Sequence, residues 1–168
     1  MLGNVAAAGA GELDNAPSIK ALRTGENAVV ATYVHPDYSV ACLVELVADR
    51  SLSTDERAEI AQAARDICMQ VAVNKPLAIR PNELEHRLVE NEKEIARTQL
   101  AQTTKPENMW DKIIEGKLRK FYEEVCLLNQ KFIKDDTINI EQKIEALAKR
   151  LLIGKLTLTR FERVAINR

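Results

Sequence analysis

The stretch Lys105–Asp136, with the sequence KPENMWDKIIEGKLRKFYEEVCLLNQKFIKDD, decides the fold of this chain. Pro106 suits the first turn of a helix, where its missing N–H leaves no bond unmade. Gly116 lies mid-helix at a cost of about 1 kcal/mol relative to Ala, so either the helix bends there or a partner helix comes close. The apolar positions recur at the helical period and form one stripe, made up of Met109, Trp110, Ile113, Leu118, Phe121 and Val125. The stretch therefore predicts a long helix with one partner face, followed by strand-forming residues.

A second long helix is predicted immediately before this one. It opens at Pro81 and ends at Thr103–Thr104, and its apolar residues fall on one narrow stripe. That stripe consists of Leu84, Leu88 and Ile95. Two helices of roughly twenty residues would each be about 30 Å long. Because each is apolar on one side only and the connection is short, we expect residues 82–128 to form an antiparallel helical hairpin, a short coiled coil that protrudes from the body.

The segments that flank this hairpin predict a sheet. Ala28–Val34 and Val40–Val47 are rich in strand-forming residues and enclose a turn, which predicts a β-hairpin. Lys155–Ile166, rich in Thr, Leu, Phe and Val, predicts a third strand.

Two further helices are predicted to cover the sheet. The first opens with a capping box, in which Ser53 and Glu56 bond each other's backbone N–H groups, and Pro76 ends it. The second spans Glu141–Leu152, and Gly154 is the candidate for its C-terminal cap. We therefore expect an α+β fold, in which a small three-stranded antiparallel sheet is packed by helices on one face while the helical hairpin protrudes.

The chain divides into a leader and one domain. Residues 1–25 are rich in Ala, Gly and small polar residues without a sustained apolar period, which predicts a flexible leader. Residues 26–168, including the hairpin, form a single domain of ordinary size that is long enough to bury a core.

Composition argues against several classes of function. The formal net charge is −1, so no basic field favours nucleic acid, and no apolar stretch approaches the roughly 20 residues that cross a bilayer. Cys42, Cys68 and Cys126 lie far apart within apolar runs, which predicts buried, reduced thiols. His35 and His86 have no partner ligand at helical spacing, and no phosphate-binding glycine loop occurs. We expect a soluble protein that is not an enzyme and binds no metal or cofactor itself.

Short motifs in the opening stretch carry a family resemblance. They are Lys105–Pro106, Ile114–Gly116, Lys120–Glu124, Leu127–Leu128, Gln130, Phe132 and Lys134–Asp135. In this order they resemble the helical hairpin of bacterial translation elongation factor Ts. The match continues more loosely outside the hairpin, at Tyr33–Pro36, Leu43–Leu46, Cys68–Ala72, Asn74–Pro76 and Arg160–Arg163. From about Gly25 onwards the chain resembles the core, or dimerisation, domain of the short, single-core form of that family.

Two departures from the family pattern bear on function. Members begin with a small three-helix domain that docks on the GTPase domain of elongation factor Tu, and nothing in Met1–Arg23 resembles it. They also carry a Thr-Asp-Phe-Val motif, whose Phe wedges beside the nucleotide site and disturbs Mg²⁺ binding. The corresponding segment Val47–Thr54 has no aromatic residue, and Leu52 is the only bulky apolar residue available for that task.

The resemblance implies a set of residues that bind elongation factor Tu. They are His35, Pro36, Leu52, Met69, Gln70, Val73 and Lys75. His35 and Pro36 occupy the predicted tip of the β-hairpin and would contact domain 3 of the partner, although an exposed turn residue explains His35 equally well. Met69 could belong to the core, whereas Gln70 on the polar side of its helix is the better contact candidate. Leu52 would take the place of the missing wedge.

The resemblance also implies a function. A factor of this family favours the nucleotide-free conformation of elongation factor Tu, and by linkage it weakens GDP and Mg²⁺ binding as much as GDP weakens its own. We expect a cytoplasmic or organellar-matrix protein that binds elongation factor Tu and promotes GDP exchange, with an activity weakened by the missing wedge. The alternative is a diverged, non-exchanging paralogue that serves as a structural or interaction module and forms homodimers through its sheet.

Overall fold

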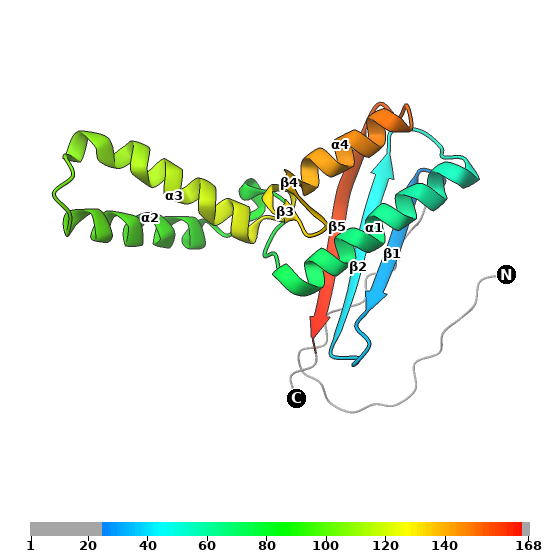
Figure 1. Ribbon diagram of the computed structural model, residues 1–168, viewed down its shortest axis with the longest axis horizontal. Coiled ribbons are helices and arrows are strands. Elements are labelled where there is room, and N and C mark those ends of the chain that lie inside the picture. The colour runs from blue at the N-terminus through cyan, green and yellow to red at the C-terminus, as the bar shows by residue number, and fades with distance from the viewer. Residues whose placement is uncertain (1–24, 166–168) are drawn as a thin grey trace.

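The computed structural model describes residues 25–165, so the leader predicted for residues 1–25 lies outside the described residues apart from Gly25. These residues form the predicted α+β fold (Figure 1). In chain order the elements are β1 (Ala28–Val34), β2 (Val40–Ala48), α1 (Thr54–Asn74), η1 (Pro81–Glu83), α2 (His86–Ala101), η2 (Glu107–Met109), α3 (Trp110–Val125), η3 (Leu127–Asn129), β3 (Lys131–Phe132), β4 (Asp135–Asn139), α4 (Ile140–Arg150) and β5 (Leu156–Ala165), where η marks a 3₁₀ turn.

Within the described residues, β2 is the central strand of the predicted three-stranded antiparallel sheet, whose strand order is β1-β2-β5. Successive side chains of a strand point to opposite faces. Cys42, Val44 and Leu46 on one face of β2 are therefore buried, whereas Leu43 and Val47 on the other face are half-buried. α1 and α4 lie over the same face of the sheet (Figure 1). The main core lies between that face and these two helices.

α1 begins and ends as the sequence predicts. The Ser53 hydroxyl accepts the Glu56 N–H at 3.3 Å, and the Glu56 carboxylate accepts the Ser53 N–H at 2.8 Å, which confirms the capping box. The helix ends at Asn74, ahead of Pro76, and Lys75 takes a left-handed conformation with φ of 48°.

The two ends of α4 differ from the prediction. The helix begins one residue earlier than predicted, because Asn139 and Gln142 form a second capping box. At the other end Leu152 takes the left-handed conformation, with φ of 53°, so the prediction that Gly154 caps the helix was wrong. Gly154 instead lies against the carboxylate of Asp49, an exposed side chain that a Cβ at position 154 would displace.

α2 and α3 form the predicted helical hairpin, which protrudes from the body (Figure 1). Its interior is a small apolar cluster that consists of Ala96, Leu100 and Ile114, with Trp110, Ile113 and Leu118 packed against it. Pro81 opens the 3₁₀ turn η1 rather than α2, which begins at His86. Proline suits the first position of a 3₁₀ turn as well as that of an α-helix, because neither position needs the N–H that proline lacks.

The apolar stripes predicted for the hairpin were partly wrong. The side chains of Ile95 and Met109 are 43% and 50% exposed. The buried positions of α2 are instead Ala96 and Leu100, which lie four residues apart on one face. Leu88, eight residues before Ala96, lies on this same face and is half-buried, so the misplaced residue of α2 is Ile95. The small side chain of Ala96 allows close packing at the contact. The predicted stripe missed Ala96 because it counted only large apolar residues, and it did not include Leu100.

Gly116 does not mark a close approach of α2, because a Cβ at this position would meet nothing within 4 Å. Gly116→Ala is therefore expected to stabilise the hairpin by up to about 1 kcal/mol, since Ala loses less conformational freedom than Gly when a helix forms. Native-state hydrogen exchange measures this locally. Amides of α3 should exchange more slowly, while those of the main sheet should keep their rates; faster exchange in α3 would contradict the open environment of Gly116.

Two buried glutamines and the small β3–β4 sheet join the hairpin to the body. Gln70 and Gln130 are 0% and 2% exposed. The Gln70 side-chain nitrogen donates to Gln130 Oε1 at 3.2 Å and to the Lys131 carbonyl at 2.7 Å, and Gln70 Oε1 accepts the Ile133 N–H at 2.8 Å. The prediction that Gln70 lies on an exposed polar side of α1 was therefore wrong. The segment from Gln130 to Ile133 covers that side of α1, and the side-chain amide of Gln70 hydrogen-bonds to backbone groups of this segment.

Candidate partner-binding surface

One end of the main sheet brings several predicted contact residues together. The β1–β2 turn carries His35 and Pro36, and the end of β5 lies beside the start of β2. The last turn of α1 reaches the same end, where Nε of Arg163 donates to the carbonyl of Ala72 at 3.4 Å. In Figure 1 the C-terminal end of α1 and the β1–β2 turn accordingly lie toward the arrowhead of β5.

We define the tip surface as the exposed residues His35, Pro36, Tyr38, Val73 and Lys75 at this end. The side chain of Tyr38 is 74% exposed and that of Val73 is 62% exposed. Exposed apolar side chains that are grouped together and rimmed by polar residues are typical of protein-binding sites. Met69, one turn before Val73, is half-buried and offers only part of its side chain.

The β1–β2 turn is held in one shape by its own hydrogen bonds. The N–H of Tyr38 donates to the His35 carbonyl at 2.8 Å, and the N–H of His35 donates to the Val40 carbonyl at 2.9 Å. The Asp37 carboxylate accepts the hydroxyl of Ser39 at 2.6 Å and its N–H at 2.8 Å. These bonds from Ser39 hold the pKa of Asp37 below its ordinary value. Local hydrogen bonds therefore fix the backbone of the tip.

Two residues of the tip surface have left-handed backbones. Tyr38 has φ of 59° and Lys75 has φ of 48°, a conformation that costs a residue with a Cβ roughly 1–2 kcal/mol. Such strain is found preferentially at functional sites. The Tyr33 hydroxyl lies 3.0 Å from Nδ1 of His35, which orients the imidazole. A turn whose backbone is already fixed by hydrogen bonds loses little backbone entropy on binding.

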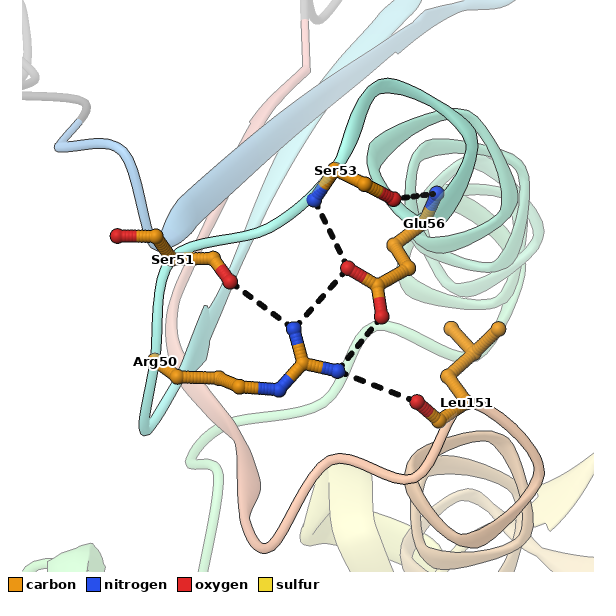
Figure 2. Close-up of polar contacts among 5 residues, drawn as sticks. All are labelled: Arg50, Ser51, Ser53, Glu56 and Leu151. Atoms are coloured by element: carbon orange, nitrogen blue, oxygen red, sulfur yellow. Dashed lines mark hydrogen bonds and ion pairs between the residues drawn. The ribbon is translucent and has the colours of Figure 1, made fainter.

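The opposite end of α1 carries a polar network built on Arg50 (Figure 2). Its guanidinium makes a bidentate pair with Glu56, with Nη2–Oε1 at 2.6 Å and Nη1–Oε2 at 3.0 Å. The same group donates to the carbonyls of Ser51 at 2.9 Å and Leu151 at 3.2 Å. Glu56 also accepts the N–H of Ser53. We call these five residues the Arg50 clamp, which joins the β2–α1 loop, the first turn of α1 and the end of α4.

Leu52 lies in this clamped loop, away from the tip surface. The 21 residues of α1 separate the two ends by about 30 Å. Leu52 is half-buried, packs against the main core and lines a shallow hollow with Gly25, Glu26 and Arg57. The structure thus does not bring Leu52 together with the other predicted contact residues, and only part of its side chain is open to a partner.

The Arg50 clamp predicts a specific acid sensitivity. Hydrogen bonds from Arg50 and then from the Ser53 N–H lower the pKa of Glu56 from 4.5 to about 2. A carboxyl whose pKa is lowered by folding stabilises the folded state above its unfolded pKa, and this contribution is lost as the pH falls through the folded pKa. Wild type should therefore lose stability more steeply than Glu56→Gln between about pH 5 and pH 2. Urea unfolding at several pH values measures this, and parallel curves for the two proteins would contradict it.

The sequence did not reveal Tyr38 or Arg50 as members of these sites. The turn around Tyr38 was predicted, but its positive φ is a property of the folded turn. Arg50 bonds to the backbone of Leu151, which is 101 positions away, and no local spacing signals such a contact. The pairing with Glu56 is also hidden, because a separation of six residues is no standard helical spacing.

The described residues offer little for metal or thiol chemistry. Among residues 25–165, no group of three or more His, Cys, Asp or Glu side chains could hold a metal ion. Cys42, Cys68 and Cys126 are buried and free, as predicted. Burial raises the pKa of Cys68 to about 12 and that of Cys126 to about 11, so both remain protonated at neutral pH. In the same part of the chain, every helix is too short or too polar to span a membrane.

These features define a class of protein. The described part of the chain is an α+β domain with a protruding helical hairpin, and its distinctive features are exposed, preordered surfaces that suit contact with another protein. A family model described as elongation factor TS matches residues 6–168. The chain belongs to the elongation factor Ts family, as the motifs of the hairpin predict.

Individual relatives agree with this assignment. The chain is 39% identical over 133 residues to elongation factor Ts of Syntrophus aciditrophicus (strain SB), which covers 79% of the chain and 66% of that protein. It is 40% identical over 139 residues to elongation factor Ts of Koribacter versatilis (strain Ellin345), and this alignment covers 82% of the chain and 60% of that protein. It is 39% identical over 146 residues to elongation factor Ts of Desulforamulus reducens, and this alignment covers 86% of the chain and 65% of that protein. The chain thus spans somewhat less than two thirds of the length of these relatives.

Proposed function

We propose that this chain binds elongation factor Tu and promotes the release of GDP from it. Membership of the elongation factor Ts family is the observation that carries this proposal. The tip surface supports it, because exposed apolar side chains lie on a preordered turn where the family resemblance implies contact with domain 3 of the partner. The role requires no catalytic group of its own, and we infer a cytoplasmic setting from it.

The proposed mechanism is differential binding. A factor that binds the nucleotide-free form of elongation factor Tu better than the GDP-bound form weakens GDP binding by the same ratio. α1 suits this task, because it is a continuous helix that separates the tip surface from the Arg50 clamp by about 30 Å. A rigid body of that length can contact two parts of a partner at once. It therefore favours the partner conformation in which both contacts fit.

Stopped-flow release of a fluorescent GDP analogue from elongation factor Tu tests the proposed function. The release rate should rise with the concentration of this chain and then saturate. An unchanged rate, with binding established separately by calorimetry, would mean a partner surface without exchange activity. An unchanged rate without binding would contradict the proposal altogether.

A second candidate function rests on the uncovered face of the main sheet. Val30, Leu43 and Val47 point away from the face that carries α1 and α4, and each is half-buried. α1 and α4 both lie over the opposite face (Figure 1). A structural module that dimerises through this sheet would use the face that carries Val30, Leu43 and Val47. Light scattering of the pure chain separates the candidates, because a tight dimer that ignores elongation factor Tu would favour the structural module.

A further inference from the structure

The turn after α4 holds an unusual leucine. Leu152 is 87% exposed and has φ of 53°. Its N–H donates to the Lys149 carbonyl at 3.3 Å, and the N–H of Ile153 donates to the Ala148 carbonyl at 2.9 Å. This pair of bonds is the Schellman motif, in which the left-handed position is usually glycine, because a Cβ is unfavourable there. Leucine occupies it here.

The neighbours of Leu152 fix its place from both sides. Ile153, the next residue, is 4% exposed and belongs to the main core. On the other side, the carbonyl of Leu151 accepts a hydrogen bond from Nη2 of Arg50 at 3.2 Å (Figure 2). The backbone is thus anchored immediately before and immediately after Leu152. The turn therefore holds the apolar side chain of Leu152 in a fixed, solvent-exposed position.

Nothing within the described fold explains a leucine at this position. Its side chain gains almost nothing from burial, and glycine or asparagine would fit the left-handed backbone with less strain. A large apolar residue that is both strained and solvent-exposed matches the pattern of strain kept at binding sites. The turn also lies at the Arg50 end of α1, where a second contact with the proposed partner would fall.

We propose that Leu152 is an apolar contact residue that inserts into an apolar hollow on elongation factor Tu, and that Arg50 is the residue that positions it. This inference rests on the proposed function. Loss of a buried leucine contact should weaken binding about 10- to 100-fold. The tip surface and Leu152 then lie at the two ends of α1 as separate contacts with one partner.

Leu152→Gly is the most informative variant, because it removes the side chain while relieving backbone strain. Its melting temperature should equal or exceed that of wild type, while its affinity for elongation factor Tu, measured by calorimetry, should fall about 10- to 100-fold. Leu152→Asn, which tolerates the left-handed backbone, should show the same loss. Ile95→Ala on α2 is the matched control, since it removes an exposed apolar side chain from the hairpin and should bind as wild type does.

Arg50→Met tests the positioning role through a double-mutant cycle. If Arg50 acts by holding Leu152 in place, Arg50→Met should weaken binding in the wild-type background but have little further effect in Leu152→Gly. A purely structural role of Arg50 would instead give the same loss in both backgrounds, which would overturn its part of the proposal.

The outcomes separate the inference from the function on which it rests. Wild-type affinity for Leu152→Gly, in a chain that does bind elongation factor Tu, would overturn the inference and leave the proposed function standing. Absence of binding by wild type would overturn both. Dissociation of a homodimer by Leu152→Gly, with unchanged affinity for elongation factor Tu, would assign the leucine to a second copy of this chain and overturn the inference as well.

Discussion

Replacing Gln70 with leucine is expected to lower the free energy of unfolding by about 3 kcal/mol or more. The leucine has a similar size but cannot hydrogen-bond, so it leaves the N–H of Ile133, the carbonyl of Lys131 and Oε1 of Gln130 without their partner. Each buried polar group left in that state costs about 1–3 kcal/mol. In the described part of the wild-type chain, every buried side-chain nitrogen and oxygen has a hydrogen-bond partner. The substitution would therefore introduce unsatisfied polar groups into a core whose buried side-chain polar atoms are all satisfied.

Urea unfolding measures this change, and Gln62→Leu provides the matched control. Gln62 lies on the exposed side of α1, where its side chain bonds only the Asp66 carboxylate at 3.2 Å. The control should differ from wild type by less than about 0.5 kcal/mol. A loss below about 1 kcal/mol for Gln70→Leu would contradict the buried network. It would return Gln70 to the exposed contact role that the sequence first indicated.

Replacing Val73 with lysine is expected to weaken binding to elongation factor Tu by about 100-fold or more. The apolar side chain is 62% exposed in the free chain, and the proposed interface covers it. Lysine removes this apolar contact and adds a charge that the interface would have to desolvate. The fold itself should tolerate the change, because a positive charge near the C-terminal end of a helix interacts favourably with the helix dipole.

Calorimetric titration of elongation factor Tu with Val73→Lys measures the affinity, and Ile95→Lys is its control. Ile95 is also an exposed β-branched residue, 43% exposed, but it lies on α2, away from the tip surface. Equal weakening by both variants would indicate a general effect of charge rather than a contact at Val73. Unchanged affinity for Val73→Lys would remove the last turn of α1 from the proposed interface.

Local signals in the sequence predicted most of the elements. The capping box of Ser53 and Glu56 located the start of α1, and Pro76 located its end. The β-hairpin and the third strand were predicted from strand-forming residues and turn chemistry, and the strands have nearly the expected bounds. Each of these signals depends only on residues that are close in the sequence, so it can be identified without a structure.

The errors concern side chains whose role depends on distant contacts. Gln70 was assigned to the surface because glutamine is polar, but the chain near Gln130 folds over it and satisfies its amide. Gly154 was assigned to a cap, but Leu152 takes the left-handed position after α4, and Gly154 lies against the carboxylate of Asp49, far away in sequence. Of the predicted contact residues, His35, Pro36, Val73 and Lys75 are exposed at one end of the main sheet. Their role in binding remains a prediction.

A comparison of two affinities tests the proposed exchange function. Calorimetry would measure the dissociation constant of this chain for nucleotide-free elongation factor Tu and for the GDP-bound form. We expect tighter binding to the nucleotide-free form, and a fall in the GDP affinity of the complex by the same ratio, because linkage between two ligands is reciprocal. Equal affinity for the two forms would contradict it, since a protein that binds both equally cannot shift the equilibrium between them.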